Sequence, residues 1–193
     1  MHSSLRAIES EHLSIASVLA GLAHFAERGL AGGNVPDARV FRAMLQYIDL
    51  FAERMHHPKE DAYLFARLRD RTHDADDVLD RLQSDHAYGL GALRALEQAF
   101  LHYEEGGAPF FAAFAQEVTR YVAFYREHMR LEETVVFPLA ERELTDEDWS
   151  AIDAAFAAHQ DPLASPAQEH DLQALFTRIV TITPTPIGVG EEV

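Results

Sequence analysis

The chain has 193 residues with a formal net charge of −16, 48 % hydrophobic residues, 11 histidines and no cysteine. This length suits one domain with a full core, and the apolar content argues against disorder over most of the chain. The acidic excess disfavours nucleic acid and anionic membrane surfaces as partners, while the lack of cysteine excludes disulfides and thiolate metal sites. Because we find neither a signal segment nor an apolar run of membrane-spanning length, we expect a cytoplasmic protein.

Two long helices are predicted in the first third of the chain. The first begins at Ser3 or Ser4, either of which can cap it, and ends near Arg28, with apolar residues at alternating steps of three and four. A glycine-rich loop follows. The second helix runs from about Asp37 to Arg69 and contains Pro58, which should kink it because proline removes a backbone donor.

Two more long helices follow, from about Asp76 to Tyr103 and from about Pro109 to Glu143, where Pro138 should bend the end. Four long helices joined by short loops must be neighbours that alternate in direction. The sequence therefore predicts an all-α fold in which residues 1–143 form an up-and-down antiparallel four-helix bundle.

The remainder, residues 144–182, is predicted to be an acidic helical extension. Thr145 and Asp148 form a capping box at the start of a short helix from Asp146 to His159, whose apolar face should pack on the bundle or against a second copy in a homodimer. That face consists of Trp149, Ile152 and Phe156. Residues 172–182 could form another short helix or an extended segment, and residues 183–193 look like a loose tail.

Each long helix places a histidine on its apolar stripe, and two helices add a glutamate one turn later. At about 1.5 Å per residue, the four histidines fall in one layer, roughly 12 to 22 Å from the same end of the bundle. One such histidine would most often be a hydrogen-bonded core residue, but four in a single layer favour a dinuclear first-row metal site with bridging carboxylates. The predicted metal ligands are His12, His56, Glu60, His86, His128 and Glu132.

Two nearby residues compete with this choice. His57 points about 100° away from His56 on an ideal helix, which places it beside the site or on the surface. Glu133 could replace Glu132, but its five-residue spacing from His128 requires a locally widened helix.

The pattern of His12, His56-x-x-x-Glu60, His86 and His128-x-x-x-Glu132 resembles the hemerythrin-like HHE cation-binding domain, and the strings HHPKED and HMRLEETVVFPLA look like those of bacterial members. The resemblance covers about residues 1–143. It implies two iron ions in a non-haem di-iron centre, with an oxo or hydroxo bridge and with the two glutamates bridging. It also implies a protein that binds, senses or reacts with a small oxidant such as dioxygen, nitric oxide or peroxide, or that handles iron.

One departure from the family concerns the third helix. Oxygen-carrying members have two histidines four residues apart there, whereas this chain has Leu82 and Leu90 on either side of His86. Simple oxygen carriage is therefore not the expected function, and whether the chain is an enzyme is left open.

Two alternatives remain. Glu9-x-x-His12 and Glu53-x-x-His56 match the Glu-x-x-His unit of ferritin-like di-iron carboxylate oxidases, but that class needs a glutamate from each of the other two helices, and the third helix offers only Asp85. A non-catalytic helical scaffold with structural zinc is the other alternative, although zinc needs four ligands and six are offered.

Overall fold

A computed structural model describes residues 2–157, 166–183 and 187–189, and within these ranges every regular element is a helix. The first long span is α1 (Ser3–Leu30), and the third is α5 (Asp76–Gly106). The second comprises α2 (Ala38–Tyr47), η1 (Ile48–His56), α3 (His57–Lys59), η2 (Glu60–Phe65) and α4 (Ala66–Arg71). The fourth comprises α6 (Ala108–Leu131), η3 (Glu132–Val136) and α7 (Phe137–Glu143).

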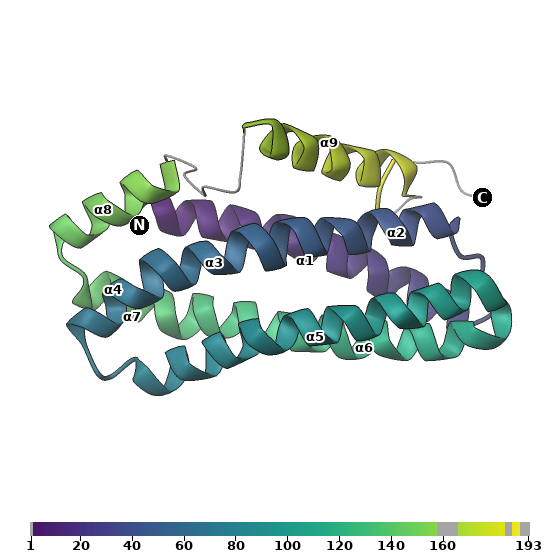
Figure 1. Cartoon of the computed structure of the whole chain (residues 1–193), viewed down its shortest axis with the longest axis horizontal. Coiled ribbons are helices and arrows are strands. Elements are labelled where there is room, and N and C mark those ends of the chain that lie inside the picture. Colours follow the sequence, from purple (N-terminus) through teal and green to yellow (C-terminus); the bar gives the residue numbers. More distant parts are fainter. Residues whose placement is uncertain (1, 158–165, 184–186, 190–193) are drawn as a thin grey trace.

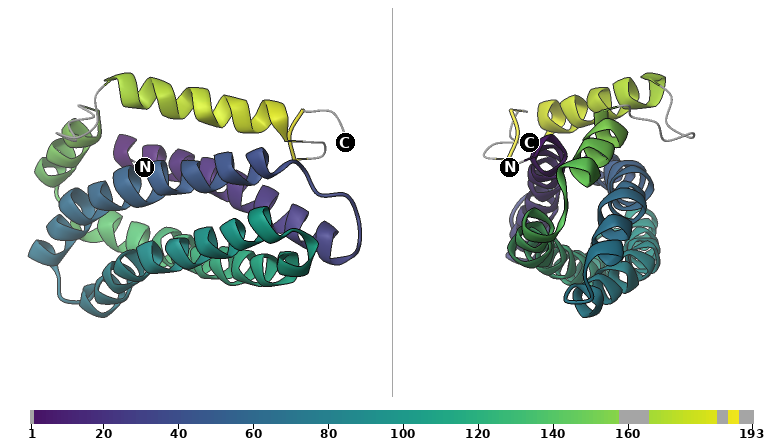
Figure 2. Two further views of the ribbon diagram at one scale, coloured as in Figure 1. Left: turned by 45° about the vertical axis from the view of Figure 1, so that its right-hand side comes forward. Right: turned by 90° about the vertical axis from the view of Figure 1, so that its left-hand side faces the viewer.

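These four spans lie side by side (Figures 1 and 2). No described helix is both long and apolar enough to cross a membrane.

Both prolines inside the long spans follow a widened, π-helical turn. The N–H of His57, just before Pro58, bonds to the carbonyl of Ala52, and the N–H of Phe137, just before Pro138, bonds to that of Glu132. A proline ring clashes with the carbonyl four residues earlier, and a bond to the fifth residue back relieves this crowding. The helices therefore continue through both prolines with their pitch changed locally.

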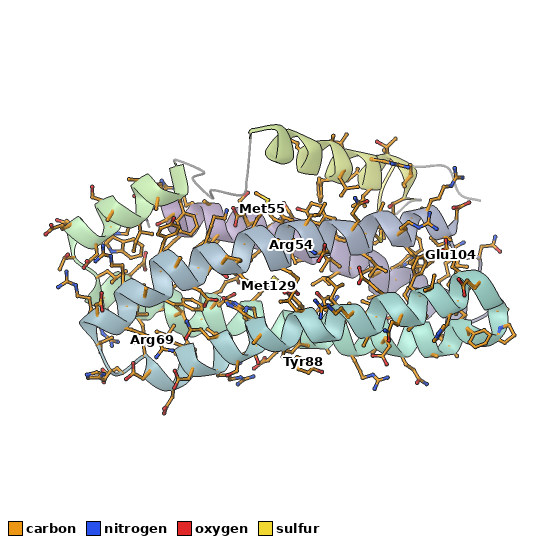
Figure 3. All side chains as sticks on the ribbon, viewed as in Figure 1. Arg54, Met55, Arg69, Tyr88, Glu104 and Met129 are labelled. Carbon is orange, nitrogen blue, oxygen red and sulfur yellow. The ribbon has the colours of Figure 1, made fainter. Side chains whose placement is uncertain are left out.

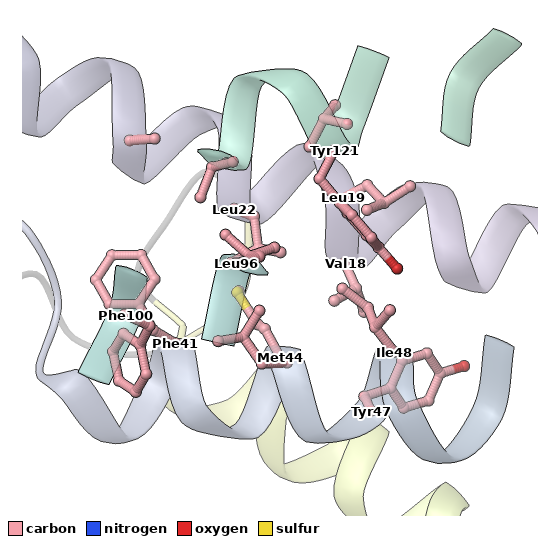
Figure 4. Packing of buried hydrophobic residues seen from close by; sticks show 14 of the residues in the cluster. Val18, Leu19, Leu22, Phe41, Met44, Tyr47, Ile48, Leu96, Phe100 and Tyr121 are labelled. Carbon is pink, nitrogen blue, oxygen red and sulfur yellow. The ribbon is translucent and has the colours of Figure 1, made fainter. Parts of the chain in front are cut away.

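Two hydrophobic clusters fill the space between the spans. The larger surrounds Phe41, Met44 and Phe114, and Figure 4 shows how Val18, Leu19 and other side chains of α1 meet those of α2 and α5 within it. The smaller lies toward the opposite end and contains the residues Leu5, Ile8, Leu64, Phe65, Leu79, Leu82 and Val136. Figure 3 shows the side chains projecting between the ribbons, with Met129 of α6 among them. A polar layer separates the two clusters.

The extension packs against α1 through helix α8 (Asp146–Ala157). Trp149 is buried and its ring stacks on that of His2, with 4.0 Å between the ring centroids. The predicted caps of α1 were wrong: His2 is the N-cap residue without a side-chain bond, and the N–H of Ser4 donates to Asp153 Oδ1 of α8 at 2.8 Å. A carboxylate from another helix thus satisfies a donor at the start of α1.

Helix α9 (Pro166–Ile182) lies along α2 (Figure 1). Phe176 contacts Tyr47 with ring centroids 5.5 Å apart, and Ile179 is buried in the larger cluster. Residues 158–159 of the predicted first extension helix lie outside the described residues. So do 184–186 and 190–193 of the predicted tail, whereas the Val189 N–H bonds to the Val180 carbonyl at 2.9 Å.

The predicted capping box at α8 is confirmed. Thr145 N–H donates to Asp148 Oδ2 at 3.0 Å, Asp148 N–H donates to Thr145 Oγ1 at 3.3 Å, and Arg71 adds bonds of 2.7 and 2.9 Å to the same carboxylate. Asp148 is only 3 % exposed. This carboxylate therefore joins α8 to the end of α4.

We expect Asp148→Ala to lower the free energy of unfolding by about 1–2 kcal/mol at neutral pH, because it removes both the cap and the partner of Arg71. Arg71 holds the pKa of Asp148 below its ordinary value. The contribution is therefore present above the unfolded pKa of about 4 and disappears as the pH falls toward the folded value. Urea unfolding at several pH values measures it, with Asp146→Ala, an exposed change in the same first turn, as the control. Equal destabilisation by both variants would contradict the prediction.

Candidate metal centre

The polar layer between the two clusters holds all six predicted ligands. On α1, His12 lies between Ile8 of the smaller cluster and Ile15 of the larger one. Each of the other spans also passes from one hydrophobic cluster to the other near its predicted ligands. Each of the six side chains is buried, with Glu60 and Glu132 at 0 % exposure. The helical period brings them together because each is on a stripe that faces the core.

Glu60 presents its two oxygens to different histidines. Oε1 lies 3.4 Å from His56 Nε2 and 3.7 Å from His12 Nε2, whereas Oε2 lies 3.8 Å from His86 Nε2. One carboxylate thus faces two groups of imidazoles, one on each side.

Glu132 has the complementary arrangement. Oε2 lies 3.3 Å from His12 Nε2, and Oε1 lies 3.3 Å from His128 Nε2 and 3.8 Å from His86 Nε2. The cluster therefore divides into two subsites, one beside His12 and His56 and one beside His86 and His128. Each subsite receives one oxygen from each glutamate.

The donor atoms fit bound cations. The ligand atoms of His12, His56 and Glu60 lie within 4.8 Å of one another, and so do those of a second group that shares Glu60. Both oxygens of Glu60 and of Glu132, and Nε2 of His12, are buried without a hydrogen-bond partner. Buried carboxylates without partners are costly, and imidazole with carboxylate is a donor set that suits divalent first-row metals.

Every predicted histidine ligand faces a carboxylate with its outer ring nitrogen. A carboxylate at Nδ1 fixes the ring orientation and the tautomer, and leaves Nε2 free to donate to a metal. These distances are 2.8 Å from His12 to Glu133, 2.7 Å from His56 to Glu11, 3.0 Å from His86 to Asp61 and 3.6 Å from His128 to Asp85. Periodicity in the sequence indicated none of these four partners, because they lie outside the apolar stripes and each belongs to a different helical span from its histidine.

The charges in the layer are strongly coupled. Burial lowers the pKa of His12, but Glu132, Glu133 and Glu60 outweigh burial and raise it well above its ordinary value. Burial also lowers the pKa of His86, but the carboxylates of Asp61 and Glu132 outweigh burial and raise this pKa to about 10. Burial raises the pKa of Glu11, yet His56 and Lys59 lower it to about 2. Positive charge near the two glutamates, from protons or metal ions, is what stabilises this layer.

Glu132, not Glu133, points into the layer. The backbone is α-helical from His128 up to Glu132, since the Glu132 N–H bonds to the His128 carbonyl, and the widened turn begins at Glu132. The four-residue spacing therefore aligns His128 with Glu132. The side chain of Glu133 is 45 % exposed and reaches back to His12 from outside the layer.

Of the two positions predicted for His57, beside the site or on the surface, the surface position was wrong. His57 is 4 % exposed, and its ligand atom lies within 4.8 Å of those of Glu60, His86 and His128. The widened turn ends at the His57 N–H, which bonds to the fifth residue back, and its wider pitch places both His56 and His57 on the inner side. Pro58 was the sequence signal that could have indicated this turn.

The ferritin-like units do not assemble here. Glu53 is buried but belongs to neither ligand group, and it accepts hydrogen bonds from Tyr125 and, at 3.1 Å, from Tyr121. Glu9 is not part of either ligand group within the described residues. The carboxylates that reach the centre are those of Glu60 and Glu132.

An all-helical fold around a buried imidazole and carboxylate cluster defines a helical cation-binding domain. Residues 3–140 match the family described as the hemerythrin HHE cation binding domain. The match covers more than half of the chain, so this protein belongs to that family. No curated protein and no solved structure matched the chain.

Proposed function

We propose that this protein is a non-haem di-iron protein that binds, senses or reacts with a small oxidant such as dioxygen, nitric oxide or peroxide, or that handles iron. Its iron ligands would be the six side chains predicted from the sequence, held in an up-and-down antiparallel four-helix bundle of residues 1–143 with residues 144–182 as an extension packed on it. The observation that carries the proposal is the division of Glu60 and Glu132 between two groups of imidazoles. Two carboxylates that each face both groups could bridge a pair of adjacent ions.

The surrounding residues would prepare the site for iron. Glu11, Asp61 and Glu133 orient three imidazoles so that Nε2 faces inward, and such outer partners commonly change metal affinity 10- to 100-fold. The hydrophobic clusters on either side of the layer exclude water and keep the dielectric low. Bound iron would supply one-electron chemistry and open coordination positions for a small ligand.

The six ligands leave room for such a ligand. Shared between two ions, two glutamates and four histidines would offer each ion two imidazoles and two carboxylate oxygens, which is fewer than the six donors of an octahedral ion. Four protein donors would close a tetrahedral zinc site, whereas an octahedral iron would keep open positions, which are typical of reactive sites. The identity of the bound metal therefore separates small-molecule chemistry from the structural-zinc alternative.

We expect protein purified from iron-containing medium to contain two iron ions per chain and to absorb visible light. The measurement is metal analysis on the same sample as the visible spectrum, because a closed zinc site is colourless. A ratio near one with all six side chains intact would reject the dinuclear site, and colourless protein with two zinc ions would favour the scaffold.

A further inference from the structure

His57 is a buried imidazole that the six-ligand set leaves without a role. Neither of its ring nitrogens has a hydrogen-bond partner, although the side chain is only 4 % exposed. Its ring stacks on that of His86 at a centroid distance of 4.2 Å and meets that of His128 edge-on at 5.3 Å. A polar ring buried in this way costs free energy unless something binds its nitrogens.

The position of His57 resembles that of the other four inward histidines. Its ligand atom belongs to one compact group with those of Glu60, His86 and His128. Nδ1 faces a carboxylate, 3.5 Å from Glu53 Oε2, just as the outer nitrogens of the other rings face carboxylates. The remaining nitrogen, Nε2, is therefore the one that is free to donate.

Glu53 is itself held in place. Two tyrosine hydroxyls of α6, those of Tyr121 and Tyr125, donate to its Oε1. On the facing helix α5, Gly89 leaves room for the carboxylate, since a Cβ there would lie 3.0 Å from Oε1. Two helices thus fix the residue that faces Nδ1 of His57, as expected for the outer partner of a metal ligand.

We propose that His57 is a fifth imidazole ligand, binding through Nε2 the ion held by Glu60, His86 and His128, and that Glu53 is the residue that positions it. This inference rests on the proposed dinuclear site and extends its ligand set. It makes the two subsites unequal, with three imidazoles beside His86 and two beside His12. The open positions for a small ligand would then be concentrated at the subsite of His12 and His56.

Proton NMR of the protein loaded with cobalt(II) alone tests this directly. A paramagnetic ion shifts the ring N–H signal of each imidazole that binds it, so unmodified protein should show five exchangeable shifted signals. The five residues are His12, His56, His57, His86 and His128. His57→Phe should remove one signal and weaken binding of one ion by at least about tenfold. His102→Phe, the same change at an exposed site on α5, should leave all five.

The positioning role of Glu53 has its own readout. Glu53→Gln should move the same signal that His57→Phe removes, while the other four keep their positions, and Glu97→Gln on the exposed face of α5 should move none. A general structural defect would disturb several signals together. If His57→Phe fails to fold, His57→Gln and the number of shifted signals in unmodified protein still test whether His57 binds the ion.

A count of four in unmodified protein, or five signals that survive His57→Phe, overturns the inference. Two bound cobalt ions with four signals would reject the role of His57 and leave the dinuclear proposal standing. Fewer than two cobalt ions in unmodified protein would instead reject the proposed function itself.

Discussion

Glu60→Gln and Glu132→Gln should each remove both metal ions together. Each carboxylate faces both subsites, so replacing one oxygen by an amide nitrogen removes one of the two anionic donors of one ion and also weakens the shared bridge. Loss of an edge imidazole such as His56 should be milder, because it lies at only one subsite. Metal analysis after gel filtration, at equal protein concentrations, measures the effect.

Glu133→Gln is the matched control for this prediction. It changes the same charge one residue further along, but Glu133 contacts only the outer nitrogen of His12. We expect affinity to fall by about 10- to 100-fold while two ions still bind at saturating metal. If Glu133→Gln removed the metals and Glu132→Gln kept them, the assignment of the bridging acid to Glu132 would be wrong.

Removal of metal should cause the largest change in stability. At free metal about 1,000-fold above the dissociation constant, each ion stabilises the folded state by about 4 kcal/mol, so two ions contribute about 8 kcal/mol. For a chain of this size that corresponds to roughly 20 °C in Tm. The physical cause is that Glu60 and Glu132 have no hydrogen-bond partner when the ions are absent.

Thermal unfolding followed by circular dichroism, with and without chelator, measures this difference. The Tm should also rise steadily with the logarithm of free metal concentration, as mass action requires. Glu60→Gln is the internal control, since its Tm should hardly depend on added metal. Identical melting of chelated and metal-loaded protein would show that the buried carboxylates are satisfied in another way.

The third long helix, α5, carries only one inward histidine, His86. The sequence lacks a second histidine there, and the structure shows why none of its neighbours replaces it. Leu82 is buried in the smaller cluster, Leu90 is 41 % exposed, and Gly89 faces Glu53. The candidate for a fifth imidazole lies instead in the second span at His57. The number of imidazoles in the layer therefore cannot be obtained from the histidines of α5 alone.

In the extension, the start of the helix could be predicted from the sequence, but its contacts could not. Its helix start was predicted because a capping box is a local motif of Thr145 and Asp148 that acts within one turn. Its contacts could not be predicted in the same way. Nothing in the sequence near Asp148 specifies Arg71, and nothing near Asp153 specifies the N–H of Ser4.

Local sequence patterns were enough to predict the long helices and the inward position of six side chains. Period-three and period-four spacing is a local property of the chain, so it assigns His12, His86 and the two His-x-x-x-Glu pairs to core-facing stripes without reference to other helices. Similar distances from the helix ends then predict one layer. The same local chemistry explains why Glu132 aligns with His128 better than Glu133 does.

The side chains that surround these six residues, by contrast, could be identified only from the packing of the helices. The partners of the outer nitrogens come largely from other helices, so their sequence separations, from His56 to Glu11 for example, have no period that a pattern could reveal. His57 turns inward because the crowding around Pro58 shifts a hydrogen bond from the fourth to the fifth residue back, which changes the helical phase that sequence reasoning assumed. Periodicity assigns a residue to a face only while the pitch is constant, and here the pitch changes within the polar layer itself.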